Sequence, residues 1–213
     1  MTEAEWLACT DPVLMLWFLR SKSDRKTRLC AAACCRLVSH LLIDRRSRET
    51  ITLAERLADD SGNRKEARLA DRLGLRGLRW VVTLGEKYER AGRAVRILAA
   101  LDRYNTVGHV IQYAEEAVRA ENLATTILPR AAGIVRDLFG NPFAPIAVPV
   151  RLTATAYSLA QSIYIDRAFD RLPILGDALE DAGCTNRDIL DHCRQPGEHV
   201  RGCWVVDLVL GKS

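Results

Sequence analysis

The sequence contains no apolar run of about 18 residues, the length that a membrane-spanning helix needs. Its first residues, MTEAEWLACTDP, are acidic and lack the basic and then apolar order of a secretory signal. Strand signals are nearly absent, and the chain has no internal repeat and no low-complexity tract. These absences favour a soluble, cytoplasmic, helical protein over a membrane protein, an exported protein or a repeat array.

Motifs of common catalytic sites are also missing. The chain has four histidines and no G-x-S-x-G elbow, H-E-x-x-H helix or glycine-rich phosphate loop. Asp177, Glu180 and Asp181 share one predicted helix face, where carboxylates could act as acid and base or bind a hard cation. A solvated helix face is the simpler interpretation. We therefore assign no catalytic residue and expect a protein that is not an enzyme.

Seven cysteines are present, and no C-x-x-C pair occurs among them. Their odd number and the length of 213 residues argue against a disulfide framework and for reduced thiols. The stretch CAAACCRLVSH combines Cys30, Cys34, Cys35 and His40, which could bind a soft metal with a partner from elsewhere. Because alanine and leucine surround these cysteines, tight packing of a buried helix is the favoured interpretation.

A second cluster lies near the end of the chain, in HCRQPGEHVRGCW. It holds His192, Cys193, His199 and Cys203. The last two are four residues apart and would share a face of a helix. A zinc site would need both of them, one of the adjacent pair 192 and 193, and a fourth ligand such as Cys184.

Packing explains the same residues. Cys203 falls among the apolar positions of a predicted final helix at 199–210, and His199 would then lie in its first turn. We favour this interpretation and keep zinc as the one possible cofactor.

Hydrophobic residues spaced three and four apart predict an all-α protein, an irregular bundle of about eight to ten helices around one core. Thr2 and Glu5 form a capping box, Asp11 caps a helix with Pro12 in its first turn, and Ser23 and Ser47 are candidate N-caps. The expected helices include 24–43, 47–60, 64–103 with a break near 83–85, 106–139 with Pro129 at a start or kink, 153–166, 171–182, 186–193 and 199–210.

The stretch GNPFAPIAVP at 140–149 marks the clearest change in composition. Gly140 suits the left-handed position after a helix, and the prolines that follow forbid one. We predict an N-terminal helical part at 1–139, a proline-rich connector at 140–152 and a compact C-terminal helical part at 153–213, with a shared core.

The phrases MTEAEWLACTDPVLML, GNPF and AFDRLPILGDALEDAGCTNRDILDHCRQPGEHVRGCWVVDLVLGK resemble a group of small planctomycete proteins. The resemblance is dense over 1–45 and 136–212 and weak over 46–135. It implies a bacterial, cytoplasmic protein whose two ends belong to one design. It implies no activity, ligand or catalytic residue.

Positive charge is concentrated in residues 20–96, which hold 20 Lys and Arg against 10 Asp and Glu. Five arginines follow one another at spacings of four, four, four and three residues: Arg64, Arg68, Arg72, Arg76 and Arg79. On one helix they would form a basic stripe about 22 Å long. Arg45, Arg46 and Arg48 form a second basic group at a helix boundary.

Three interpretations of this stripe remain open. It could be a solvated face interleaved with Glu66 and Asp71, a surface for an acidic protein partner, or a site for a nucleic-acid backbone. Aromatic residues are only 6% of the chain and none lies within the stripe before Trp80, which weighs against nucleic acid. We therefore expect a helical interaction or regulatory module that binds an acidic protein surface, with nucleic-acid binding and a zinc-stabilised module as alternatives.

Overall fold

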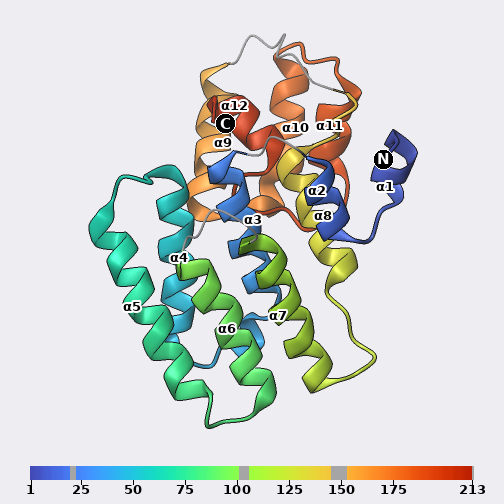
Figure 1. Cartoon of the computed structure of the whole chain (residues 1–213). Helices are drawn as coiled ribbons and strands as arrows, with labels where there is room; N and C mark the ends of the chain where they lie inside the picture. Colours follow the sequence, from blue (N-terminus) through green and yellow to red (C-terminus); the bar gives the residue numbers. More distant parts are fainter. Residues whose placement is uncertain (20–22, 101–105, 145–152, 213) are drawn as a thin grey trace. The chain divides into compact units, whose positions relative to one another are not determined.

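The all-α prediction is confirmed by a computed structural model that describes residues 1–19, 23–100, 106–144 and 153–212 (Figure 1). Within these ranges the chain forms twelve α-helices and two short 3-10 turns, and no strand. The chain divides into two compact units. One comprises Ala8–Val135, and the other combines Met1–Leu7 with Arg136–Ser213. Among the described helices, none is both long and apolar enough to span a membrane.

The unit Ala8–Val135 is a bundle in which neighbouring helices in the chain pack on one another. Each helix from α3 to α7 contacts the next, and α7 returns to contact α3 (Figure 1). Its helices are α2 (Pro12–Phe18), α3 (Asp24–Leu37), α4 (Arg45–Asp59), α5 (Arg64–Val81), α6 (Glu86–Ala100), α7 (Thr106–Glu121) and the greater part of α8 (Leu128–Phe139).

The helix boundaries follow local chemistry at several predicted points. Backbone N–H groups of Thr2 and Glu5 donate to each other's side chains, which is the predicted capping box. Asp11 accepts from two N–H groups at the start of α2. The long stretch 64–103 breaks between α5 and α6, where Gly85 has a φ of 125°. Pro129 is the second residue of α8, where its missing N–H costs nothing.

The predicted N-cap at Ser47 is wrong. Helix α4 begins at Arg45, and Asp44 caps it by accepting from the Arg46 N–H. Ser47 is buried inside the helix because it faces Gly77 of α5. Ser23 does occupy the N-cap position of α3, without a side-chain hydrogen bond.

The second unit contains four helices between Ala154 and Leu210. Helix α9 (Ala154–Asp166) packs on α10 (Leu172–Asp181) and α12 (Trp204–Leu210), and α11 (Arg187–Arg194) packs on α10 and α12. Their shared core includes Ile163, Leu175, Leu179, Ile189, Val205 and Val209. Helix α1 (Glu3–Ala8) begins this unit at the other end of the chain.

The division between the units falls at Arg136, inside α8, and the first seven residues group with the C-terminal unit. Gly140 has the predicted left-handed conformation, with a φ of 65°. Residues 145–152 of the predicted connector lie outside the described part of the chain. The predicted final helix at 199–210 starts only at Trp204, because Gly202 has a φ of 93° that a helix does not accommodate.

Candidate metal centre and basic surface

Four side chains with metal-binding atoms converge in the C-terminal unit. They are Asp137, His192, His199 and Cys203, and one donor atom of each lies within 4.8 Å of the others. Asp137 is in the last turn of α8, His192 is near the end of α11, His199 is in the loop after α11, and Cys203 is the N-cap residue of α12. Three of the four predicted ligands are therefore brought together.

One carboxylate oxygen lies at the centre of the cluster. Asp137 Oδ1 is 2.7 Å from Nδ1 of His199 and 3.1 Å from Nε2 of His192. The same His192 nitrogen is 3.2 Å from Sγ of Cys203. The second oxygen, Oδ2, accepts a hydrogen bond of 2.9 Å from the backbone N–H of Val200, which fixes the orientation of the carboxylate.

The cluster is shielded from water. The Asp137 side chain is 4% exposed, each of the two histidine side chains is 9% exposed, and Cys203 is fully buried. The Trp204 ring lies 5.0 Å from the His192 ring, and it also lies against Gly140. Interactions between charged groups are strong in such a site because water does not screen them.

The electrostatics of the cluster reflect burial and mutual contact. Burial raises the pKa of Asp137, but hydrogen bonds from the two histidines outweigh it, so the carboxyl pKa lies below its ordinary value. Burial lowers the pKa of His199, yet the hydrogen bond to Asp137 and its charge raise it above normal. Burial and the Asp137 charge raise the pKa of the Cys203 thiol.

Cys193 does not belong to this cluster. Its Cβ lies 2.9 Å from where a Cβ on Gly176 would be, so it packs against α10. Adjacent residues on a helix point about 100° apart, which explains why His192 turns to the cluster and Cys193 does not. Cys184 is buried in the same apolar core as Cys193. The fourth member, Asp137, was missed because no sequence spacing connects it with residues 192–203.

The other candidate clusters have ordinary structural partners. Cys30, Cys34 and Cys35 are buried in α3, as the packing interpretation predicts, and His40 is exposed and contacts Glu121. The acidic residues of α10 are solvated. There, Arg194 Nη2 bonds Asp177 at 2.7 Å and Glu180 at 2.5 Å.

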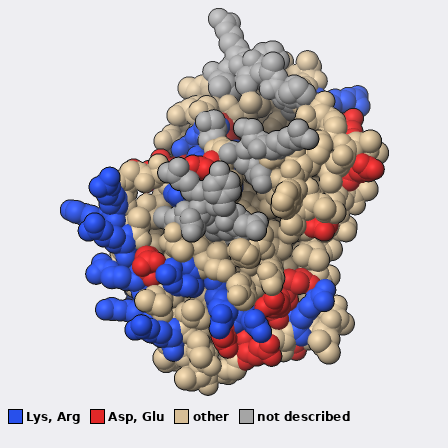
Figure 2. All heavy atoms as spheres, in the orientation of Figure 1, with Lys and Arg blue, Asp and Glu red and all other residues tan. Residues whose placement is uncertain are grey.

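The five arginines of the predicted stripe are all exposed on α5. In Figure 2, blue spheres of Lys and Arg gather at the left edge of the view, where α5 lies in Figure 1. Arg64, Arg68, Arg72, Arg76 and Arg79 have no carboxylate partner among the described residues. We call these five residues the basic stripe.

The acidic residues of α5 are turned to other helices. Glu66 pairs with Arg56 of α4 at 2.8 Å, and Asp71 pairs with Arg96 of α6 at 2.8 Å. Glu66 and Asp71 therefore do not pair with the arginines of the stripe, and its interpretation as a solvated face stays open. Elsewhere in the same unit, arginines form ion pairs, such as Arg36 with Glu55 and Arg93 with Glu89.

Apolar surface flanks the basic stripe at both ends. A groove of about 860 Å³ beside α5 is lined by residues that include Arg68, Leu69, Arg72 and Ala99. At the other end, Trp80 is 47% exposed, and Leu75, Val82 and Leu84 are exposed as well. Exposed apolar groups thus adjoin the cationic groups near both ends of α5.

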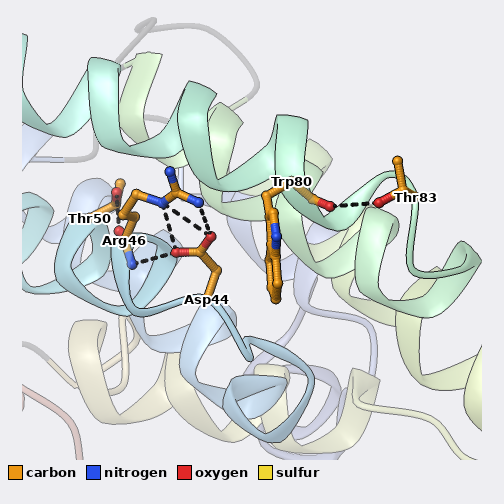
Figure 3. A network of polar contacts seen from close by, with 5 residues as sticks. All are labelled: Asp44, Arg46, Thr50, Trp80 and Thr83. Atoms are coloured by element: carbon orange, nitrogen blue, oxygen red, sulfur yellow. Dashed lines mark hydrogen bonds and ion pairs between the residues drawn. The ribbon is translucent and has the colours of Figure 1, made fainter.

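The start of α4 extends this surface. Asp44 binds the Arg46 guanidinium through both carboxylate oxygens, and the Trp80 side chain extends from α5 beside this pair (Figure 3). Arg45 and Arg48 are exposed, and Ser47 between them faces Gly77 of α5. The second predicted basic group therefore lies near the C-terminal end of the basic stripe, although Arg46 itself is neutralised by Asp44.

No family model matches the chain, and no curated protein or solved structure matches it either. Functional conclusions therefore rest on the geometry of these two places.

Proposed function

We propose that the protein is a non-enzymatic interaction module that binds an acidic, amphipathic segment of another protein along the exposed face of α5. One observation carries this proposal: five arginines of one helix are exposed without carboxylate partners, while the acidic residues of that helix pair with neighbouring helices. Aligned, unneutralised charge of one sign repels itself and is relieved by a partner of opposite charge.

Charge supports an acidic partner over a basic or neutral one. The unit Ala8–Val135 holds 23 Lys and Arg against 15 Asp and Glu, a net charge of +8. Arginine binds carboxylates through two parallel hydrogen bonds, which gives geometric selectivity as well as attraction. Arg64, Arg68, Arg72 and Arg76 rise about 6 Å from one to the next along the helix, the spacing of glutamates placed every fourth residue on a partner helix.

The apolar neighbours favour a protein over a nucleic acid. Leu75, Val82 and Leu84 are aliphatic and exposed near the end of the stripe. Nucleic-acid bases stack on aromatic rings, and aliphatic side chains offer them little. A protein segment can place apolar side chains on these residues and in the groove beside Leu69.

Fluorescence anisotropy of a labelled synthetic helix tests the proposal. The probe carries glutamate at every fourth position and leucine beside it, and it is compared with single- and double-stranded oligonucleotides. We expect the double variant R68E/R72E of the full chain to bind the peptide at least about tenfold more weakly, because two attractions become repulsions.

The matched control is R171E/R187E, which makes the same change in net charge at exposed arginines of the other unit. This control should bind the peptide within about twofold of wild type, a difference of under 1 kcal/mol. Equal weakening in both variants would reduce the effect to net charge and contradict the proposal. If an oligonucleotide bound more tightly than the peptide, and if only R68E/R72E lost that binding, the partner would be a nucleic acid and not a protein.

A further inference from the structure

We propose that Asp137, His192, His199 and Cys203 bind one zinc ion in a closed, four-coordinate site that stabilises the C-terminal unit. All four residues belong to that unit, so the inference is independent of the basic stripe on α5. Three arguments support it: the chemistry of the donor atoms, their separation, and the contacts that hold them from behind.

The donor set matches zinc. It consists of two imidazole nitrogens, one sulfur and one carboxylate oxygen, all of which are zinc ligands in proteins. Magnesium and calcium prefer sites made of oxygen atoms alone, so the sulfur and the imidazoles disfavour them. Binding requires the Cys203 thiol to lose its proton to solvent, after which the thiolate and the Asp137 carboxylate balance the two charges of the ion.

The separations are close to those of a tetrahedral site. Bonds of 2.0–2.3 Å to zinc place ligand atoms about 3.3–3.7 Å apart. Contacts between donor atoms of the cluster are 2.7, 3.1 and 3.2 Å, and no pair exceeds 4.8 Å. To accept the ion, the closest pair would need to separate by about 0.6 Å and the widest pair to approach by up to about 1 Å.

Contacts behind the ligands orient their lone pairs. The Val200 N–H holds Oδ2 of Asp137 and leaves Oδ1 directed at the histidines. Nδ1 of His192 lies 3.2 Å from the side-chain nitrogen of Gln195. Rotation of this amide by 180° would place its oxygen at Nδ1, which could then carry the proton and leave Nε2 free to bind metal, as in zinc-binding histidines.

Without a metal, the same atoms would form a hydrogen-bond network. Both histidines point a nitrogen at the same oxygen of Asp137, and Nε2 of His192 also faces Cys203 Sγ. A cation between the four donor atoms would replace these shared contacts with one bond from each donor.

The position of the site indicates a structural role. Four protein ligands fill a tetrahedral site and leave no open position for a substrate, as in structural zinc sites. The ion would join the end of α8, the end of α11 and the start of α12. The unit is assembled from 7 residues at one end of the chain and 78 at the other, and metal binding would add its free energy to the stability of the fold.

The first test measures metal in the full chain purified without added zinc or chelator. We expect about one zinc per chain by elemental analysis. The apo protein, prepared with a chelator, should then take up Co²⁺ with the intense visible bands of a tetrahedral site and a sulfur-to-cobalt absorption in the near ultraviolet. Trp204 fluorescence should change on binding because its ring adjoins His192.

Cys203→Ser and Cys193→Ser form a matched pair, since both remove a buried sulfur of the same unit. Cys203→Ser should lose zinc and the sulfur-to-cobalt absorption, whereas Cys193→Ser should keep both. Chelator should lower the melting temperature of wild type and Cys193→Ser but not of Cys203→Ser.

The wild-type measurements need no variant and decide the matter even if Cys203→Ser does not fold. Protein without zinc whose apo form gives no sulfur-to-cobalt band would leave the cluster as a hydrogen-bond network and overturn the proposal. Iron or copper in place of zinc, at the same stoichiometry, would overturn the assignment of the metal. Equal loss of zinc in both cysteine variants would place the ion elsewhere.

Discussion

Gly77 of α5 lies so close to Ser47 of α4 that a Cβ atom at position 77 would be 2.6 Å from the Ser47 Oγ. The two helices can approach at this point only because residue 77 has no side chain. One turn earlier in α5, a Cβ atom at Gly74 would lie 3.0 Å from the Ala99 Cβ of α6 and 3.6 Å from the Thr50 Cγ2 of α4. Glycine within α5 is thus explained by helix packing and not by a break in the helix.

Gly77→Ala should therefore destabilise the protein by about 1–3 kcal/mol, although alanine is the better helix former. Ser47→Ala removes the obstructing oxygen, so Gly77→Ala in that background should cost little or increase stability. Urea unfolding followed by helical circular dichroism measures both effects as a double-mutant cycle. Gly133→Ala is the control, because nothing lies within 4 Å of its added Cβ and helix propensity alone should act. Equal costs of Gly77→Ala in both backgrounds would show that Ser47 is not the obstacle.

Periodicity in the sequence predicted the helices and the exposed face of α5, because both depend on residues close together in the chain. The partners of Glu66 and Asp71 could not be predicted, since they come from α4 and α6 through tertiary packing. The basic stripe was therefore visible in the sequence, but whether nearby acids neutralise it was not.

The metal centre shows the same limit. The RQPGE segment indicated a loop after α11, yet we expected His199 inside the final helix, and Gly202 delays that helix until Trp204. His199 and Cys203 meet through a loop and not through a helical face. Asp137 comes from α8, far from the other ligands in the chain, and only the fold brings it to them.

Asp44 gives the start of α4 a predictable dependence on pH. The hydrogen bonds and charge of Arg46 hold the pKa of the Asp44 carboxyl below its ordinary value, despite burial. A lowered pKa means that the ionised form stabilises the fold. This stabilisation is complete above the unfolded pKa of about 3.9 and disappears as the pH falls through the folded pKa.

Asp44→Asn separates the cap from the charge, because asparagine caps helices as well as aspartate does. We expect this variant to be less stable than wild type near neutral pH and to match it in strong acid. Asp44→Ala should lose about a further 1 kcal/mol at every pH, since it also removes the cap. Urea midpoints across the acid range measure the difference. A gap between wild type and Asp44→Asn that stays constant as the pH falls would contradict the linkage to this carboxyl.

Cysteine reactivity should follow burial. Cys9 is partly exposed, whereas the other six cysteines are buried. Burial raises the pKa of Cys193 to about 12 and also raises the pKa of Cys35. The thiolate is the reactive form of cysteine. At about pH 8 these two thiols are almost entirely protonated and are also shielded from reagents, so they should react slowly.

Iodoacetamide treatment of the native protein should therefore label Cys9 first, and peptide mass mapping should find Cys35 and Cys193 unmodified. In urea all seven cysteines should react, which shows that protection comes from the fold. Slow labelling of a buried thiol in native protein would report opening of its unit, and its rate should rise with subdenaturing urea. If Cys35 is labelled as fast as Cys9, α3 does not bury its cysteines against α4 and α7, and the packing assigned to this helix is wrong.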